Sequence, residues 1–359
     1  MKVLHFIYGL ALGGAESFIR SCMIAMKDRD IDWHFALQNP VVTNRFFTEN
    51  VSVGNIHLLP SFTRNPIGLY RALTKLIKSE QFDVVHIHAN ALINPIPLIA
   101  CLVCGQRFVI HSHNTATNNG FVCRVIHGMN KSWLAFNKSA IRVACSQSAG
   151  QWMFGRKAYS VVNNAIDINH YIFNEQSRAE IRSRYGIADN AYVIGSVGRM
   201  VEAKNLPFMI SLFRNYLKLN PSARFLLVGD GPLKGNIEKL AADLGNKIIF
   251  VGPQQETAPF YSAMDCFIAP SLFEGLPVVM VEAQASGVNI VVSDAIPEEV
   301  NVSGLINRLS LSEPTEVWLN LLAHPCATNQ ERKERGLKLL NCKFNLPFLA
   351  ETLSDIYSE

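Results

Sequence analysis

The chain of 359 residues has the length of two domains of ordinary size, and its 49% of apolar residues can form two cores. No stretch of about 20 uncharged apolar residues occurs, so no membrane-spanning helix is expected. The formal net charge of +4 is unevenly divided, because residues 1–170 carry +8 and the remainder −4. This asymmetry suggests that one half faces an anionic surface or substrate, although an unevenly charged, solvated surface is the alternative.

The first half alternates short β-branched and aromatic runs with longer amphipathic patterns. The run Val3–Tyr8 leads straight into a glycine turn and a helix, without a signal-peptide cleavage site, so the protein is expected to stay in the cytoplasm. In chain order we predict strands at Lys2–Tyr8, Asp32–Leu37, Val84–His88, Arg107–His111 and Ile141–Cys145, and helices at Ala15–Met26 and Leu69–Ser79. This order is typical of a doubly wound parallel sheet.

The alternation stops between Asn163 and Ala191, and we place a linker near Ile166–Glu175. A charged helix at Ser177–Tyr185 follows. Strands are then predicted at Tyr192–Val197, Arg224–Val228, Lys247–Val251, Cys266–Ala269 and Asn289–Ser293, and helices at Pro207–Leu219, Leu233–Leu244, Pro277–Ser286 and Phe348–Tyr357. The expected fold is α/β, with two Rossmann-like, doubly wound parallel-sheet domains facing a central cleft, where ligands usually bind. The domains would span 1–168 and 169–340, and residues 341–359 would form a helix that packs back toward the first domain.

Gly13 and Gly14 end the first strand and open the first helix. A helix N-terminus offers unpaired N–H groups and a partial positive charge to a phosphate, and glycine lets the backbone come close to it. A plain tight turn is the alternative. The spacing is not the G-x-G-x-x-G of dinucleotide-binding proteins, which argues against a nicotinamide dehydrogenase.

The second half opens with Gly198 and Arg199, and Lys204 follows five residues later. A guanidinium and an ammonium together can hold a diphosphate. A solvated pair of surface cations is the alternative. The position after a strand, on the ligand-binding edge of an α/β sheet, favours the ligand.

The segment Pro270–Ala283 carries two carboxylates, Glu274 and Glu282. Pro277 suits the first turn of a helix and Gly287 its end, so Glu274 would lie above the helix N-terminus and Glu282 inside it. Two carboxylates spaced in this way could bind a sugar and a ribose that are joined by a diphosphate. A buried or capping Glu282 is the alternative, but it would be costly without a partner, which favours a ligand.

Over nearly its whole length the chain resembles glycosyltransferase family 4, most of all the members that assemble exopolysaccharide, capsule or O-antigen repeats. The specific part of the resemblance is the Glu274-x7-Glu282 element. Supporting segments are Gly13-Gly14-Ala15-Glu16, His111-Ser112-His113-Asn114, Asn163-Asn164-Ala165-Ile166-Asp167, Gly198-Arg199 with Lys204-Asn205, and Val228-Gly229-Asp230-Gly231. The resemblance implies the GT-B fold. One departure is Ala165, where the family has a glycine, because alanine tolerates positive φ poorly.

The resemblance also implies roles for individual residues. Glu274 would hold the donor sugar and Glu282 the nucleotide ribose. The diphosphate would be held by Arg199 and Lys204, and the glycine loop would approach it from the other domain. The implied catalytic residues are Glu274, His113, Arg199 and Lys204, and the implied donor-binding residues are Gly13, Gly14, Arg199, Lys204, Gly275, Leu276, Pro277, Val278 and Glu282. His113 would lie near the reacting centre, and His111 fits a functional or a structural role equally well.

No metal or other cofactor is expected. The segment Asp28-Arg29-Asp30 has the D-x-D spacing of metal-dependent glycosyltransferases, but its place between a helix and a strand suits a solvated turn. Cys101 and Cys104 lack a second ligand pair, so the eight cysteines are expected to be core thiols. Cationic side chains and helix N-termini can neutralise the leaving diphosphate instead.

These observations predict a retaining, metal-independent hexosyltransferase that moves a hexose from a UDP-sugar to a lipid-linked saccharide in surface polysaccharide biosynthesis. Its partners would be the nucleotide-sugar donor, the lipid-linked acceptor and the anionic inner face of the cytoplasmic membrane, bound peripherally, and no nucleic acid. Candidate membrane contacts are Arg64–Lys78 and Phe121–Lys138, where basic and apolar residues interleave. The alternatives are a sugar-nucleotide epimerase of the same architecture and a non-catalytic sugar-nucleotide-binding subunit.

Overall fold

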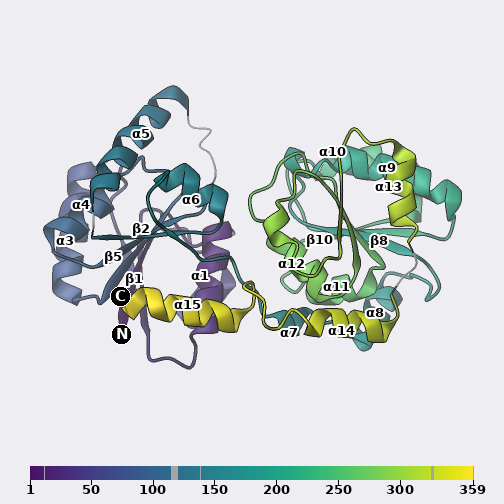
Figure 1. Cartoon of the computed structure of the whole chain (residues 1–359), viewed down its shortest axis with the longest axis horizontal. Helices are drawn as coiled ribbons and strands as arrows, with labels where there is room; N and C mark the ends of the chain where they lie inside the picture. Colours follow the sequence, from purple (N-terminus) through teal and green to yellow (C-terminus); the bar gives the residue numbers. More distant parts are fainter. Residues whose placement is uncertain (12, 115–119, 138, 325–326, 359) are drawn as a thin grey trace. The chain divides into compact units, whose positions relative to one another are not determined.

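The computed structural model describes residues 1–11, 13–114, 120–137, 139–324 and 327–358. The chain forms two compact units, one of Met1–Ala165 with Leu346–Glu359 and the other of Ile166–Asn345 (Figure 1). Each unit is built on one parallel sheet with helices packed against it, so the predicted α/β class is confirmed. No helix within the described ranges is long and apolar enough to cross a membrane.

The first unit contains a seven-stranded sheet in the order β3-β2-β1-β4-β5-β6-β7, and every neighbouring pair is parallel. The strands are β1 (Lys2–Ile7), β2 (Asp32–Leu37), β3 (Ile56–Leu58), β4 (Val84–Ala89), β5 (Phe108–Ser112), β6 (Ala140–Ala144) and β7 (Ser160–Val161). The order turns back between β1 and β4, which makes the carboxyl edge of these two strands the switch point of the sheet.

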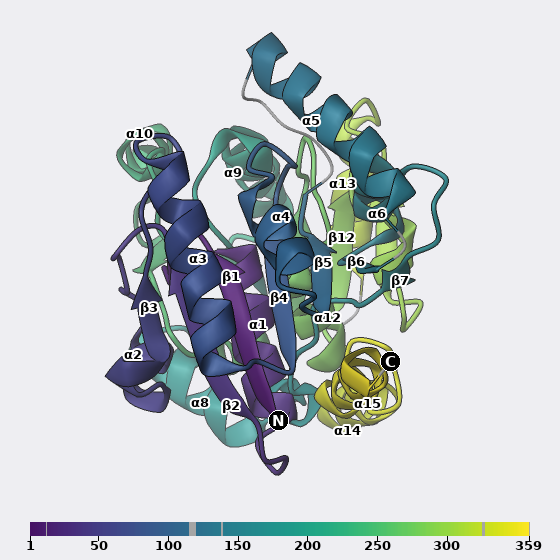
Figure 2. The ribbon, with the colours of Figure 1, turned by 90° about the vertical axis from the view of Figure 1, so that its left-hand side faces the viewer.

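Helices cover both faces of this sheet. They are α1 (Gly14–Ala25), α2 (Arg45–Asn50), α3 (Pro66–Glu80), α4 (Ile96–Val103), α5 (Gly120–Phe136), α6 (Gln147–Phe154) and α15 (Leu346–Ser358). Along β1, Leu4 and Phe6 belong to the core under α3 and α4, whereas Val3 and Ile7 belong to the core under α1 and α15. Figure 2 shows α3 and α4 in front of the strands. The period of two along the strand therefore produces two hydrophobic cores, one for each face.

Helix α15 closes the first unit although it follows the whole second unit in sequence. Its apolar residues Leu349 and Leu353 are buried in the same core as Phe18 of α1. Arg107, just before β5, donates to the carbonyl oxygens of Ile356 and Tyr357 at 2.8 and 2.7 Å. These carbonyls lie in the last turn, where a helix leaves its acceptors without internal partners.

The second unit contains a six-stranded parallel sheet in the order β10-β9-β8-β11-β12-β13, which turns back between β8 and β11. Its strands are β8 (Val193–Val197), β9 (Arg224–Val228), β10 (Ile248–Gly252), β11 (Cys266–Ala269), β12 (Asn289–Ser293) and β13 (Ile306–Leu309). Its α-helices are α7 (Ile168–Tyr171), α8 (Glu175–Arg184), α9 (Leu206–Leu219), α10 (Lys234–Leu240), α11 (Ala258–Ala263), α12 (Val278–Ala285), α13 (Thr315–Leu322) and α14 (Asn329–Leu337).

A buried ionic network ties α8 to the second sheet. The two carboxylate oxygens of Asp265 accept from Arg178 and Arg182 at 2.7 Å each. One of these oxygens also accepts from the backbone N–H of Val193 at 2.8 Å. Asp265 lies just before β11 and Val193 begins β8, so this carboxylate joins a helix and two strands at the amino edge of the sheet.

The sequence-based prediction missed several helices and strands. The helices that it did not contain are α2, α4, α6, α7, α11, α13 and α14. Strands β3, β7 and β13 were not predicted. The helix expected at Leu233–Leu244 ends at Leu240, and a 3-10 segment, η3 (Ala242–Lys247), follows with Gly245 at a φ of 52°. Among the described residues other than glycine, only Gln81 and Asn205 adopt positive φ, so the linker turn does not place Ala165 there.

Candidate functional site

The carboxyl edge of the second sheet gathers the charged residues that the sequence singled out. Gly198 and Arg199 follow β8 directly, and the loop with Glu274 follows the neighbouring strand β11. Because the strand order turns back here, this edge is where an open α/β sheet binds ligands. The backbone N–H of Leu272 donates to the carbonyl of Ala203 at 2.8 Å, which joins the two loops.

The loop after β8 rests on glycines of the loop after β9. A Cβ atom on Gly229 would lie 2.0 Å from the Gly198 carbonyl oxygen, and one on Gly231 would lie 2.5 Å from the Met200 carbonyl oxygen. Gly229 also has a φ of 134°, which L-residues rarely adopt. The carbonyl of Asp230 accepts from the N–H of Met200 at 2.8 Å. The Gly-Asp-Gly motif therefore supports the loop that carries the arginine.

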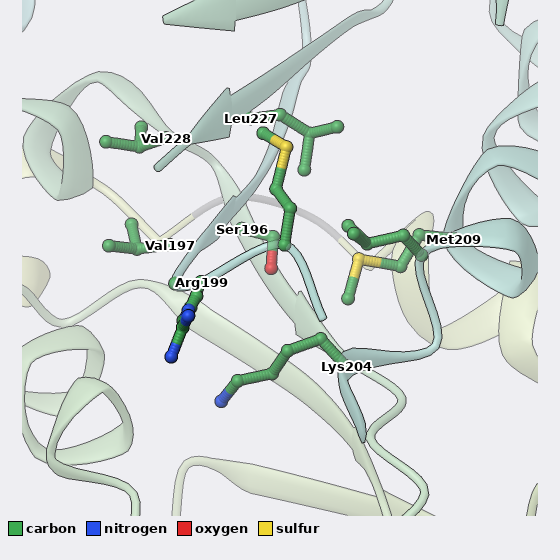
Figure 3. A pocket seen from close by; sticks show the side chains of 10 residues that line it. Ser196, Val197, Arg199, Lys204, Met209, Leu227 and Val228 are labelled. Atoms are coloured by element: carbon green, nitrogen blue, oxygen red, sulfur yellow. The ribbon is translucent and has the colours of Figure 1, made fainter. Parts of the chain in front are cut away.

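Arg199 and Lys204 line one pocket, together with apolar side chains of β8, β9 and α9. Figure 3 shows both cationic side chains extending to the same side of this pocket. Arg199 is exposed, and Lys204, the last residue of the 3-10 helix η2 (Glu202–Lys204), is half-buried. Two neighbouring cations at a sheet switch point suit a diphosphate.

Glu274 is the centre of a small polar network. Its Oε1 accepts from Lys204 Nζ at 2.5 Å and from Ser271 Oγ at 2.8 Å. The side chains of the ion pair are only 12% and 21% exposed, for Glu274 and Lys204 respectively. The sequence placed both residues after strand ends but did not predict that they pair. The pair holds one anionic and one cationic group in defined positions at the switch point.

The residues after Glu274 lead into α12. Gly275 is exposed, Leu276 packs against the hydrophobic core, Pro277 is the N-cap and Val278 is the first helical residue. Among the residues that the structure describes, no side chain caps this end of the helix. Its first N–H groups therefore keep the capacity to bind an anion.

Glu282 lies on the first turns of α12 and is held by α11 and the loop before it. Its Oε2 accepts from Tyr261 Oη at 2.7 Å and from Thr257 Oγ1 at 3.4 Å. Burial raises the pKa of the Glu282 carboxyl, and the hydrogen bonds from Tyr261 and Thr257 oppose the rise. The sequence-based argument that a buried Glu282 would lack a partner is therefore wrong, because the fold supplies two hydroxyl donors.

In the first unit, Gly13 is the N-cap of α1 and Gly14 is its first residue. A Cβ atom on Gly13 would lie 2.4 Å from Glu16 Oε2, so this glycine leaves room for a carboxylate beside the helix N-terminus. A Cβ atom on Gly14 would meet no described atom within 4 Å. A Cβ at Gly13 would require only a movement of the flexible Glu16 side chain, so the fold of this unit strictly requires neither glycine, and ligand approach to Gly14 stays a prediction.

His113 follows β5 and belongs to a cluster of five histidines that the sequence-based analysis missed. Its Nε2 lies 2.8 Å from His88 Nδ1, and its ring stacks on His111 with centroids 4.0 Å apart. Burial lowers the pKa of His113 to about 3. The other members are His5 and His86. The signal was present in the sequence, because His86/His88 and His111/His113 each have the two-residue spacing that puts both side chains on one face of a strand.

The remaining candidates do not form a site. Asp28 and Asp30 are exposed in the turn between α1 and β2. The seven cysteines in the described ranges are free thiols. Cys326 lies outside those ranges.

Comparison with known proteins defines the class. Residues 12–170 match the family model for Glycosyltransferase Family 4, and residues 191–316 match that for Glycosyl transferases group 1. EpsF of Bacillus subtilis (strain 168), described as a glycosyltransferase, is 33% identical over 348 residues, which is 93% of this chain and 90% of EpsF.

Two further relatives extend this similarity. UDP-Gal:alpha-D-GlcNAc-diphosphoundecaprenol alpha-1,3-galactosyltransferase of Escherichia coli is 24% identical over 331 residues, or 84% of this chain and 81% of that one. The crystal structure of Anabaena Alr3699/HepE in complex with UDP superposes with a TM-score of 0.79 at 19% identity, and the match covers 100% of both chains.

The two parallel-sheet units and this structural match define a protein of the GT-B class. Within that class, the chain belongs to glycosyltransferase family 4. The family and fold predicted from the sequence are thereby confirmed.

Proposed function

We propose that this glycosyltransferase moves a hexose from a UDP-sugar to a lipid-linked saccharide, with retention of the anomeric configuration, in the biosynthesis of a surface polysaccharide. The observation that carries the proposal is the meeting of Arg199, Lys204 and Glu274 at the switch point of the second sheet. The UDP complex of HepE and the names of the polysaccharide and O-antigen relatives support it. The diphosphoundecaprenol in the name of the E. coli relative supports a lipid-linked acceptor.

The ion pair between Lys204 and Glu274 suggests how the donor is received. On donor binding, Lys204 turns from Glu274 to the diphosphate, beside Arg199. The released Glu274 carboxylate then accepts hydrogen bonds from sugar hydroxyls, and the Glu282 carboxylate accepts from the ribose. Lys204 and Glu274 each exchange a protein partner for a ligand partner, so neither charge is left buried without a partner.

Transfer breaks the bond between the anomeric carbon and the diphosphate oxygen. The acceptor hydroxyl attacks from the same face, and its proton passes to the departing phosphate oxygen. Arg199, Lys204 and the uncapped N-terminus of α12 stabilise the negative charge that develops on the diphosphate. No metal ion has a role in this scheme. Catalysis comes from positioning and electrostatic stabilisation.

A peripheral membrane location is part of the proposal. Helix α5 extends away from the sheet of its own unit (Figures 1 and 2) and exposes Phe121, Val122 and Met129, the last 68% exposed. The basic residues Arg124 and Lys131 lie on the same helix. The other candidate segment carries less weight, because Leu69, Leu73 and Ile77 of α3 are buried in the core, although Ile67 is exposed.

A panel of UDP-sugars and a GDP-sugar tests the proposal. One UDP-hexose should bind by calorimetry and be slowly hydrolysed, and with a polyprenyl-diphosphate saccharide it should give an α-linked product identifiable by NMR. The rate should survive EDTA. Interconversion of the sugar without acceptor would identify an epimerase, and binding without any turnover would identify a non-catalytic subunit. Loss of activity in EDTA with rescue by Mg²⁺ or Mn²⁺ would overturn the metal-free mechanism.

A further inference from the structure

Five imidazoles lie on one face of the first sheet, below α1 and α15; His5, His86 and His111 are buried, and His88 and His113 are half-buried. They come from β1, β4 and β5, and they are His5, His86, His88, His111 and His113. They make two separate chains of hydrogen bonds. In the first, His5 Nδ1 lies 2.8 Å from His88 Nε2, and His88 Nδ1 lies 2.8 Å from His113 Nε2. In the second, Tyr357 Oη lies 2.7 Å from His86 Nδ1, and His86 Nε2 lies 3.2 Å from His111 Nδ1.

The rings are arranged for hydrogen bonding rather than for a metal ion. Two trios, His5/His86/His88 and His88/His111/His113, have nitrogens close enough to consider as ligands. Each trio contains a stacked pair: His86 on His88 at 4.4 Å and 9°, or His111 on His113 at 4.0 Å and 27°. Imidazole lone pairs lie in the ring plane, so those of stacked rings run side by side and do not converge. The contacts of 2.8 Å are also shorter than the roughly 3.3 Å between nitrogens around a tetrahedral zinc.

Burial favours the neutral form of all five rings. Burial lowers the pKa of His5 and His113 to about 3, and it lowers the pKa of the other three well below the usual range. A neutral imidazole has one N–H donor and one bare acceptor nitrogen. If His88 accepts from His113, it must therefore donate to His5, and if it accepts from His5, it must donate to His113. The first chain has only two states, and one choice sets the proton position on all three rings.

The two outer nitrogens of this hydrogen-bonded chain of histidines decide between these states. Within the described residues, His5 Nε2 and His113 Nδ1 are buried without a hydrogen-bond partner. In one state His5 Nε2 carries an unpaired N–H; in the other, the unpaired N–H is on His113 Nδ1 and His5 has only a bare lone pair. A buried donor without a partner is the costlier defect. A ligand oxygen at His113 Nδ1 removes that defect only in the second state.

We propose that His88, backed by His5, is a positioning residue that keeps the proton of His113 on Nδ1, so that His113 donates a hydrogen bond to a substrate oxygen and does not act as a base. The inference rests on the proposed function only for the nature of the substrate. Which ring nitrogen of His113 carries the proton depends on this hydrogen-bonded chain of histidines.

The test compares two matched substitutions in one strand. His88→Phe keeps an aromatic ring in the stack but removes both hydrogen bonds to His5 and His113. His86→Phe makes the same change two residues earlier, in the chain that ends at His111. With ¹⁵N-labelled histidine, the imidazole nitrogen shifts distinguish protonated from bare nitrogens, and the His113 signal is identified by its loss in His113→Gln. Unfolding curves show that each variant is folded.

The His113 signal of the parent protein with bound UDP-sugar should report Nδ1–H. His88→Phe should convert it to a mixture of tautomers and lower kcat about tenfold at unchanged donor KM. His88→Gln should restore the Nδ1–H form, because its amide can donate to His113 Nε2. His86→Phe should leave the His113 signal unchanged.

Three results would overturn the inference. They are a bare Nδ1 in the bound parent protein, a His113 tautomer indifferent to His88→Phe, and stoichiometric Zn²⁺ or Ni²⁺ in the purified protein, because a coordinated nitrogen carries no proton. If His88→Phe changes the His113 tautomer but leaves kcat unchanged, the hydrogen-bonded chain exists but His113 does not donate to the substrate in the reaction.

Discussion

The two carboxylates Glu274 and Glu282 are separated by seven residues but are held by different chemistry. Glu274 is paired with a cation that a ligand can take away, whereas Glu282 is anchored through one oxygen by two neutral hydroxyl groups. A mobile ion pair suits a residue that acts on the reacting sugar. A fixed acceptor suits a residue that recognises a constant part of the donor.

Substitutions at these two positions should therefore affect different quantities: the rate at Glu274 and the affinity for UDP at Glu282. Glu274→Ala should lower kcat about 10²- to 10³-fold, as removal of one preorganised polar group from an active site does. UDP should bind as well as before or more tightly, because Lys204 loses its protein partner. Glu282→Gln should instead weaken UDP about ten- to a hundredfold, the loss of a hydrogen bond to a charged acceptor.

For each variant, calorimetric titration with UDP measures the affinity, and steady-state rates at saturating donor measure kcat. Loss of UDP binding in Glu274→Ala with an unchanged rate at saturation would exchange the two assignments.

Much of this site can be predicted from sequence, but its partners cannot. Motif residues after strand ends place Arg199 and Glu274 at one edge of a sheet without any structure. The donors to Glu282 come from Thr257 and Tyr261, 25 and 21 residues earlier, and no motif marks them. The same holds for the histidines, whose contacts depend on the register between β1, β4 and β5.

At the scale of helices and strands, Asp265 should contribute strongly to the free energy of unfolding of the second unit. It joins α8 to β8 and β11, and of its two arginine partners Arg182 is buried and Arg178 half-buried. Asp265→Ala would leave both guanidinium groups without their anion, one of them fully buried, which costs about 3–5 kcal/mol. Urea unfolding of the two-unit chain should show a clear fall in the midpoint of the second unit.

The exposed ion pair of Arg214 and Asp243 in the same unit is the matched control. Asp243→Ala should leave the midpoint unchanged within error, because solvent screens surface pairs. Equal effects of the two substitutions would show that burial does not set the strength of the Asp265 network.

The central strands were predicted well, whereas three of the four edge strands were missed, for a physical reason. Strands such as β8 and β11 are covered on both faces and read as continuous apolar runs. The edge strands β3, β7 and β13 have only two to four residues and are partly exposed, so their apolar pattern is too short to distinguish them from loops.

For the molecule as a whole, the buried histidines predict sensitivity to acid. Their pKa is lower in the folded chain than the unfolded value near 6.5, so the unfolded chain binds more protons below that pH. Stability is fully present above pH 6.5 and falls as the pH drops toward 3. Each such histidine contributes a slope of about 1.4 kcal/mol per pH unit.

Urea unfolding at pH 7.5, 6.5 and 5.5, followed by tryptophan fluorescence, measures this slope. Three of the four tryptophans, Trp33, Trp133 and Trp152, lie in the first unit with the histidines. A midpoint that rises on acidification would contradict the assignment of neutral, buried rings.

Membrane attachment is the second property at this scale. Phe121→Glu with Met129→Glu should reduce co-sedimentation with anionic vesicles, because both side chains are exposed on α5. High salt should also release the protein, since the basic residues of the first unit act through screened charge. Leu219→Glu is the control, a 65% exposed apolar residue of the second unit. Equal binding to neutral and anionic vesicles would remove the electrostatic part of the proposal.

Helix α15 also determines the order in which the polypeptide can mature during translation. The second unit is continuous in sequence, and all of it is synthesised before α15. The α15 face of the first sheet therefore stays uncovered until Leu349 and Leu353 have been made. Tyr357, the partner of His86, is likewise made after the whole second unit. The unit that is begun first thus depends on a segment that is synthesised after the other unit.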